Sequence, residues 1–144
     1  MWLRFSPLFL FVTVLSVSPA TAAAPVKLTD RDRAVIVASV ARNLFRPGAN
    51  YQGEHFILAD GIRAEWIPKI RGYDVRLVTR EEIQNTTTRI FYYVFQLRAS
   101  KRSVHVTVTA YDSETKTLPH VDLHYSYWRT RHGWRGKYLW GGGD

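Results

Sequence analysis

The sequence of 144 residues contains no cysteine. This absence excludes a disulfide scaffold, an iron–sulfur cluster, a cysteine-ligated zinc site and a cysteine nucleophile, and also a lipid anchor on an N-terminal cysteine. A glycine-rich phosphate loop, a GxSxG nucleophile motif and an HExxH zinc motif are absent as well. We therefore expect no cofactor and no metal site, and the sequence leaves any catalytic residue unknown.

Acidic residues are few beside the basic ones, with 12 Asp and Glu against 20 Lys and Arg, so the formal net charge is +8. The hydrophobic content of 46% and the aromatic content of 14% are too high for a disordered chain. A chain of this length supports one domain. Because disulfides cannot hold that domain, we expect aromatic side chains to supply much of its core.

Long hydrophobic runs are absent apart from one near the N-terminus, Leu8 to Val17. Arg4 precedes this run and the small residues of Ala20-Thr21-Ala22 follow it, which is the pattern of a secretory signal peptide. An uncleaved membrane anchor is the alternative, but the run is short for the ~20 residues that a spanning helix needs. We expect a signal peptide at residues 1–22, a single domain at residues 23–144 with no transmembrane span, and a secreted or periplasmic location.

One segment has the period of a helix. Apolar residues recur at helical spacing from Ile36 to Leu44. Thr29 or Asp30 can cap the start of this segment, and Pro47-Gly48 ends it. The pattern predicts an N-terminal helix with one apolar face.

The residues after Gly48 have the pattern of strands and turns. Alternation is clearest where Val104, Val106 and Val108 are separated by single polar residues. The expected strands cover residues 51–58, 73–77, 90–98, 104–110, 121–127 and 134–140, with a loop or short helical turn at 81–88. This order predicts an α+β fold, with the N-terminal helix packed on a curved antiparallel sheet of four to six strands.

The order of these segments resembles the nuclear transport factor 2-like, or cystatin-like, superfamily in architecture rather than in motif. The segments that carry the resemblance are the helix at Thr29–Arg46, the strand pair at residues 90–113 and the aromatic ending at residues 120–140. Most members open with two or three helices that form a cone-shaped pocket over the sheet, whereas one helix is obvious here. The superfamily includes isomerases, dehydratases and binding modules, so the resemblance implies a fold and no single activity.

A stretch at residues 125–138 interleaves cations with aromatic rings, and no acidic residue lies between Asp122 and Asp144. Cations neutralise an anionic polymer, while rings stack or make cation–π contacts. The candidate ligand-binding residues are Trp128, Arg129, Arg131, His132, Trp134, Arg135 and Lys137. The alternative is an ordinary hairpin with rings in the core and arginines in solvent, and the spacing of Tyr125 and Tyr127 fits that alternative.

The histidines give only a weak metal-site pattern. His105 and His124 are expected to be cross-strand neighbours on one face, where Asp122 or Glu54 could complete a site. The chain has no HxH spacing, and solvated or hydrogen-bonded histidines are the better interpretation.

Two kinds of function are expected from this pattern. The first is a small exported binding module that contacts an unknown protein or an anionic ligand through its basic hairpin, with chromosomal nucleic acid not expected as a partner. A homodimer through the sheet, with Tyr92 in the interface, is a further expectation. The alternative is a cone-pocket enzyme, an isomerase or hydrolase that would need a base in a cavity lined by Glu54, His55 or His124.

Overall fold

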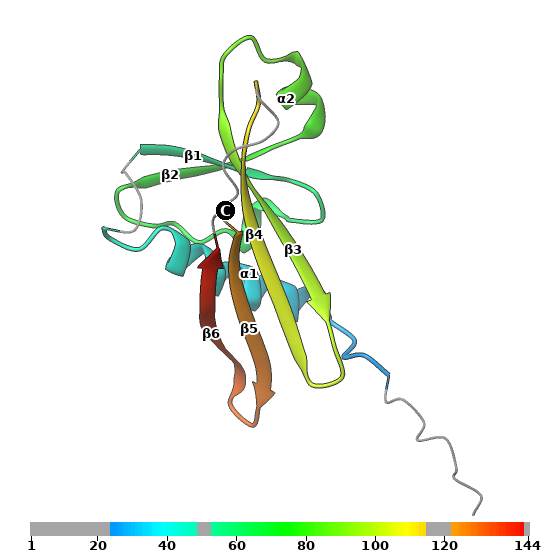
Figure 1. Ribbon diagram of the computed structural model, residues 1–144. Coiled ribbons are helices and arrows are strands. Elements are labelled where there is room, and N and C mark those ends of the chain that lie inside the picture. The colour runs from blue at the N-terminus through cyan, green and yellow to red at the C-terminus, as the bar shows by residue number, and fades with distance from the viewer. Residues whose placement is uncertain (1–23, 49–52, 115–121, 143–144) are drawn as a thin grey trace, which may run out of the picture.

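The computed structural model describes residues 24–48, 53–114 and 122–142. The predicted signal peptide, the first two residues of the strand expected at 51–58 and the start of the strand expected at 121–127 lie outside these ranges. Within them, no helix is long and apolar enough to cross a membrane. The elements are α1 (Asp30–Leu44), β1 (Gly53–Leu58), the 3-10 helix η1 (Ala64–Trp66), β2 (Tyr73–Val78), α2 (Arg80–Asn85), β3 (Phe91–Ala99), β4 (Ser103–Asp112), β5 (Asp122–Thr130) and β6 (Gly133–Gly142) (Figure 1).

Helix α1 begins where the sequence provides a cap. The Asp32 amide donates to the Thr29 hydroxyl at 3.1 Å, and the Thr29 amide donates to the Asp32 carboxylate at 3.0 Å. This capping box satisfies two amides that a helix N-terminus leaves unpaired. The predicted apolar stripe is confirmed, since its residues Ile36, Val37, Val40, Ala41 and Leu44 are all buried.

Six strands form one sheet in the order β2-β1-β3-β4-β5-β6. Strands β3 to β6 are an antiparallel meander, as predicted. Figure 1 shows that the sheet curls, so that β1 and β2 run across the direction of the other four strands. The predicted α+β class, with an N-terminal helix on a curved sheet, is confirmed.

The sheet is mixed rather than wholly antiparallel, which corrects the expectation for its β1–β2 side. Strand β1 runs parallel to both β2 and β3. A parallel pair needs a crossover connection, and the chain supplies one through η1 at residues 59–72 and another through α2 at residues 79–90. Alternation of side chains does not reveal strand direction, because parallel and antiparallel strands both alternate their side chains between two faces.

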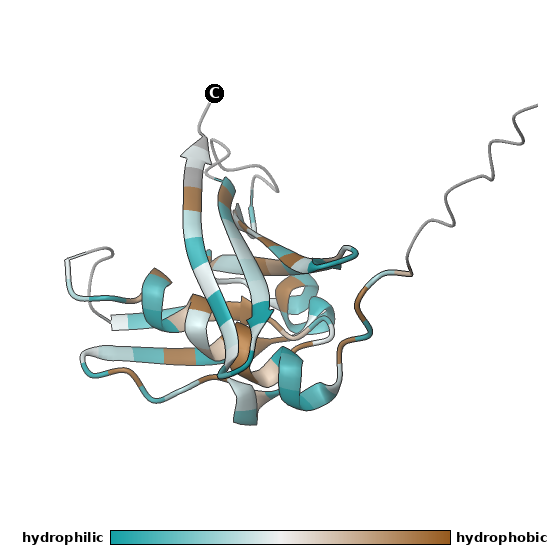
Figure 2. Ribbon diagram, turned by 90° about the horizontal axis from the view of Figure 1, so that it is seen from below, coloured by the Kyte–Doolittle hydropathy of each residue, from teal (hydrophilic) through white to brown (hydrophobic). Residues whose placement is uncertain are grey.

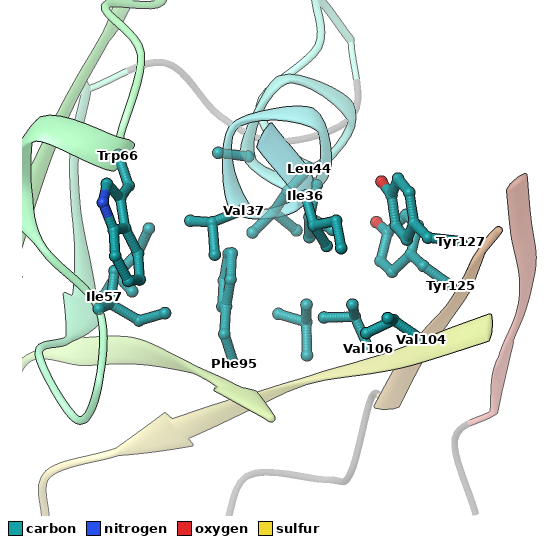
Figure 3. Close-up of a cluster of buried hydrophobic side chains, with 14 of the residues drawn as sticks. Ile36, Val37, Leu44, Ile57, Trp66, Phe95, Val104, Val106, Tyr125 and Tyr127 are labelled. Carbon is teal, nitrogen blue, oxygen red and sulfur yellow. The ribbon is translucent and has the colours of Figure 1, made fainter. Parts of the chain in front are cut away.

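Helix α1 lies against the concave side of the sheet, which we call the inner face (Figure 2). Its apolar stripe packs among side chains from four strands, including Ile57, Phe95, Val106 and Tyr125 (Figure 3). Trp66 of η1 belongs to the same cluster. The inner face is therefore filled by the hydrophobic core, and the outer face of β3–β6 carries the other half of the alternating side chains.

Candidate functional site

Strand β5 divides the basic and aromatic stretch between the two faces of the sheet. Tyr125 and Tyr127 lie in the core with 3% and 4% of their surface exposed, which confirms the inward orientation expected from their spacing. The next residue, Trp128, is 38% exposed on the outer face. Residues paired across antiparallel strands share a face, so the register of β5 and β6 assigns each strand residue of the stretch to one face of the sheet.

Arg129 and Trp134 form an inner-face pair that contacts the first turn of α1. The Trp134 indole Nε1–H donates to the Asp32 carboxylate at 2.7 Å. The Arg129 guanidinium lies 3.6 Å from the same carboxylate and 5.8 Å from the centre of the Trp134 ring. These two candidate residues therefore hold the last hairpin against the helix, and Trp134 is partly buried there.

Asp32 is a buried carboxylate with an unusually complete set of partners. The hydrogen bond from Trp134, and after it the hydrogen bond from the Thr29 amide, lowers the pKa of Asp32 to about 2 against the opposing effect of burial. The Thr29 hydroxyl also donates to this carboxylate, at 2.8 Å. Hydrogen bonds and a cation that favour the charged form keep the carboxylate ionised.

The outer face of the meander carries a row of basic and polar side chains. The register places Arg98 opposite His105, His105 opposite Ser126, and Ser126 opposite Lys137. Neighbouring strands are about 4.8 Å apart, so this row spans roughly 14 Å of backbone from Arg98 to Lys137. In the adjacent row Trp128 lies between Ser103 and Arg135.

Two turns add further cations at the same end of the sheet. The β3–β4 turn contains Lys101 and Arg102, and the β5–β6 turn contains Arg131 and His132, all four of them exposed. Figure 1 shows both turns side by side at the lower end of the meander. The Arg131 side chain donates to His132 Nε2 at 2.8 Å, so these two side chains form one unit.

We call this surface the cationic face, and its members are Arg98, Lys101, Arg102, His105, Trp128, Arg131, His132, Arg135 and Lys137. In the described part of the chain, no carboxylate lies within ion-pair distance of its lysines and arginines. Two arginines on the β1–β2 side have carboxylate partners instead. Arg76 lies 2.7 Å from Asp74 and 3.2 Å from Glu54, and Arg80 lies 2.6 Å from Asp60.

The structure brings together five of the seven candidate residues, namely Trp128, Arg131, His132, Arg135 and Lys137. The other two face the helix, as described above. The β3–β4 hairpin contributes cations that the sequence reasoning missed. Alternate turns of an antiparallel meander lie at the same end of the sheet, and applying this rule to the RASKRSVH segment at residues 98–105 would have found them.

The residues considered for other chemistry lie apart. His55 is 2% exposed among the rings of Phe45, Tyr73 and Tyr93 on the inner face. Glu54 is exposed and paired with Arg76, and His124 lies on the outer face. The three candidate residues named for the cone-pocket alternative therefore lie apart from one another.

The two strand histidines share a face, as predicted, but they are diagonal neighbours. The register pairs His105 with Ser126 and His124 with Thr107. Asp122 on the same strand accepts a hydrogen bond from Thr109 at 2.6 Å. Among the residues that the structure describes, no group of three or more His, Asp or Glu side chains is arranged to hold a metal ion.

Comparison with known proteins gives no match for this chain among family models, curated proteins or solved structures.

Proposed function

We propose that this protein is a small exported binding module that contacts an anionic partner through its cationic face. The observation that carries the proposal is a set of lysines and arginines around an exposed tryptophan on one open sheet face, none of which has an ion-pair partner among the residues that the structure describes. Cations that are not neutralised within the protein attract an anionic ligand over a distance of about 8–10 Å at physiological salt. The Trp128 ring can stack on a planar or apolar part of the same partner.

The width of the surface supports a polymer or a charged surface as the partner rather than a single small ion. The cations come from two turns and from strands β3 and β6, with Arg98 and Lys137 at opposite ends of one row. Each exposed charge of such a surface contributes a modest amount of binding free energy, and the affinity comes from the sum of these contributions.

Self-association through the sheet is less well supported than binding of an anionic partner. Two copies that met through their cationic faces would place like charges together, which opposes association. Tyr92, the residue expected in such an interface, lies on the outer face but stacks on Tyr111, with ring centres 5.7 Å apart. We expect the protein to sediment as a monomer at micromolar concentration.

The architecture is compatible with the nuclear transport factor 2-like superfamily, and we include membership in the proposal. Two observations favour a binding module within that superfamily over a cone-pocket enzyme. The concave face is packed with core side chains from α1 and the strands, and the acid–base candidates lie apart. Fold alone does not assign activity in either case.

The proposal is tested with a charge-reversal pair and a matched control. Arg135→Glu with Lys137→Glu changes the cationic face, whereas Lys69→Glu with Arg71→Glu changes two exposed cations next to β2 by the same net charge. Binding to dextran sulfate, to anionic phosphatidylglycerol vesicles and to single-stranded DNA is measured over a salt series. We expect at least one of these to bind, with affinity that falls as salt rises.

The first pair should weaken that binding about tenfold at low salt, since each surface charge contributes up to about 1 kcal/mol. The control pair should have a much smaller effect. Equal losses for the two pairs would show that only net charge matters. Weak, salt-insensitive binding to all three probes would reject an electrostatic partner.

A further inference from the structure

A pocket of about 600 Å³ lies at the other end of the outer face, away from the turns that carry the cations. Its floor is formed by Tyr92 and Gln96 of β3 and Tyr111 of β4, and its walls by α2 and residues 86–89. Figure 1 shows α2 near the start of β3 and the end of β4. This volume is in the range of small-molecule sites.

The charged groups around the pocket are already neutralised within the protein. The Arg80 guanidinium is 2.6 Å from the Asp60 carboxylate. Arg89 donates to Asp112, which is fully buried, and lies 3.8 Å from Glu114. In contrast to the cationic face, this pocket offers no uncompensated arginine, so we expect charge to contribute little to recognition there.

The remaining lining combines aromatic rings with uncharged polar groups. Tyr92 and Tyr111 are stacked at an interplanar angle of 21°. Gln84 and Gln96 supply amides, and residues 86–88 are threonines with hydroxyl groups. Amides and hydroxyls both donate and accept hydrogen bonds.

We propose that this pocket binds a neutral sugar ring, as part of an oligosaccharide. A pyranose ring has an apolar face of C–H groups, which suits an aromatic surface, and a rim of hydroxyls, which suits amides and threonines. Leu58, Ile83 and Val94 add apolar walls that exclude water from one side of the ligand. This proposal is independent of the anionic partner, because its ligand is uncharged and its residues are different.

The test is a titration of the isotope-labelled protein with three neutral trisaccharides, cellotriose, maltotriose and N,N′,N″-triacetylchitotriose, followed by NMR at high salt. High salt suppresses binding to the cationic face, so the two proposals fail or succeed separately. We expect at least one trisaccharide to give saturable shifts at the amides of Tyr92, Gln96 and Tyr111 and in α2. No saturable shift for any of the three, or shifts confined to the β5–β6 hairpin, would overturn the proposal.

Variants test the assignment of the residues. Tyr92→Ala removes one ring of the stack and should weaken binding about tenfold, while Tyr138→Ala, at an exposed tyrosine on β6, should leave it unchanged. Gln84→Ala lies on the exposed side of α2 and should fold normally, so its loss of affinity reports the pocket even if Tyr92→Ala is unstable. Unchanged affinity in both Tyr92→Ala and Gln84→Ala would overturn the proposal.

Discussion

Tyr127 and Trp128 are consecutive residues of β5 with opposite surroundings. Tyr127 is 4% exposed, and its hydroxyl donates to the Ser39 hydroxyl of α1 at 3.0 Å. Trp128 is 38% exposed and lies between Ser103 and Arg135 on the outer face. The difference shows that the same strands contribute to two properties. Their inner-face side chains stabilise the fold, and their outer-face side chains form the candidate binding surface. Substitutions should therefore affect one property and leave the other largely unchanged.

The largest expected effect is on the inner face. Phe95→Ala should lower the free energy of unfolding by about 3–5 kcal/mol, because it leaves a cavity in the core beneath α1. Arg98→Ala, three residues along the same strand on the outer face, should change it by less than about 0.5 kcal/mol. Urea denaturation of both variants measures the contrast. Similar losses of unfolding free energy in the two variants would mean that the two faces do not differ in their contribution to stability.

A smaller loss is expected where the hairpin meets the helix. Trp134→Phe keeps an aromatic ring but removes the indole donor to Asp32, and should cost about 1–2 kcal/mol of unfolding free energy. Trp128→Phe is the matched change on the outer face and should change the unfolding free energy by less than about 0.5 kcal/mol. If Trp134→Phe were as neutral as Trp128→Phe, the hydrogen bond to Asp32 would not contribute to stability.

The same contact predicts a dependence on pH. The pKa of Asp32 is lowered from 3.8 to about 2 in the folded protein, so its ionised form stabilises the fold above pH 3.8. This contribution is lost as pH falls from about 4 to about 2, where the folded carboxylate takes up a proton. Unfolding free energies measured across that range should fall less steeply with acid in Trp134→Phe than in the wild type. Parallel curves would contradict the prediction.

Only a small stability effect is expected when two charges of the cationic face are reversed. Arg135→Glu with Lys137→Glu should change the unfolding free energy by less than about 1 kcal/mol, because neither side chain has an ion-pair partner among the described residues and β6 exposes both. The same variant is the one expected to lose binding to polyanions. A large loss of stability would show that these charges support the fold, and it would weaken the separation between the two faces.

Sequence patterns predicted much of this fold because its strands alternate regularly. The spacing of Tyr125 and Tyr127 correctly placed both rings in the core, and the apolar stripe of α1 is buried as expected. The parallel pairing of β1 was not predictable from alternation. It depends on where the two crossover segments place β2 and β3, which is a property of the whole sheet.

The candidate site was predicted only in part, because strand register also decides which side chains share a face. Composition located the basic and aromatic hairpin, but it treated Arg129 and Arg135 alike. The register separates them, since Arg129 pairs with Trp134 on the inner face and Arg135 pairs with Trp128 on the outer face. The role of Asp32 depends on a contact between residues 102 positions apart, and no local pattern reports such a contact.

That long-range contact also bears on the rate of folding. Closing a loop of this length carries an entropic cost, so contacts of high sequence separation slow folding. Within the described sheet, strand β6 pairs with β5 alone, and its Trp134 contacts the first turn of α1. Arg135 and Lys137 lie on that same strand, so the strand that joins the two ends of the domain on its inner side also carries part of the cationic face on its outer side.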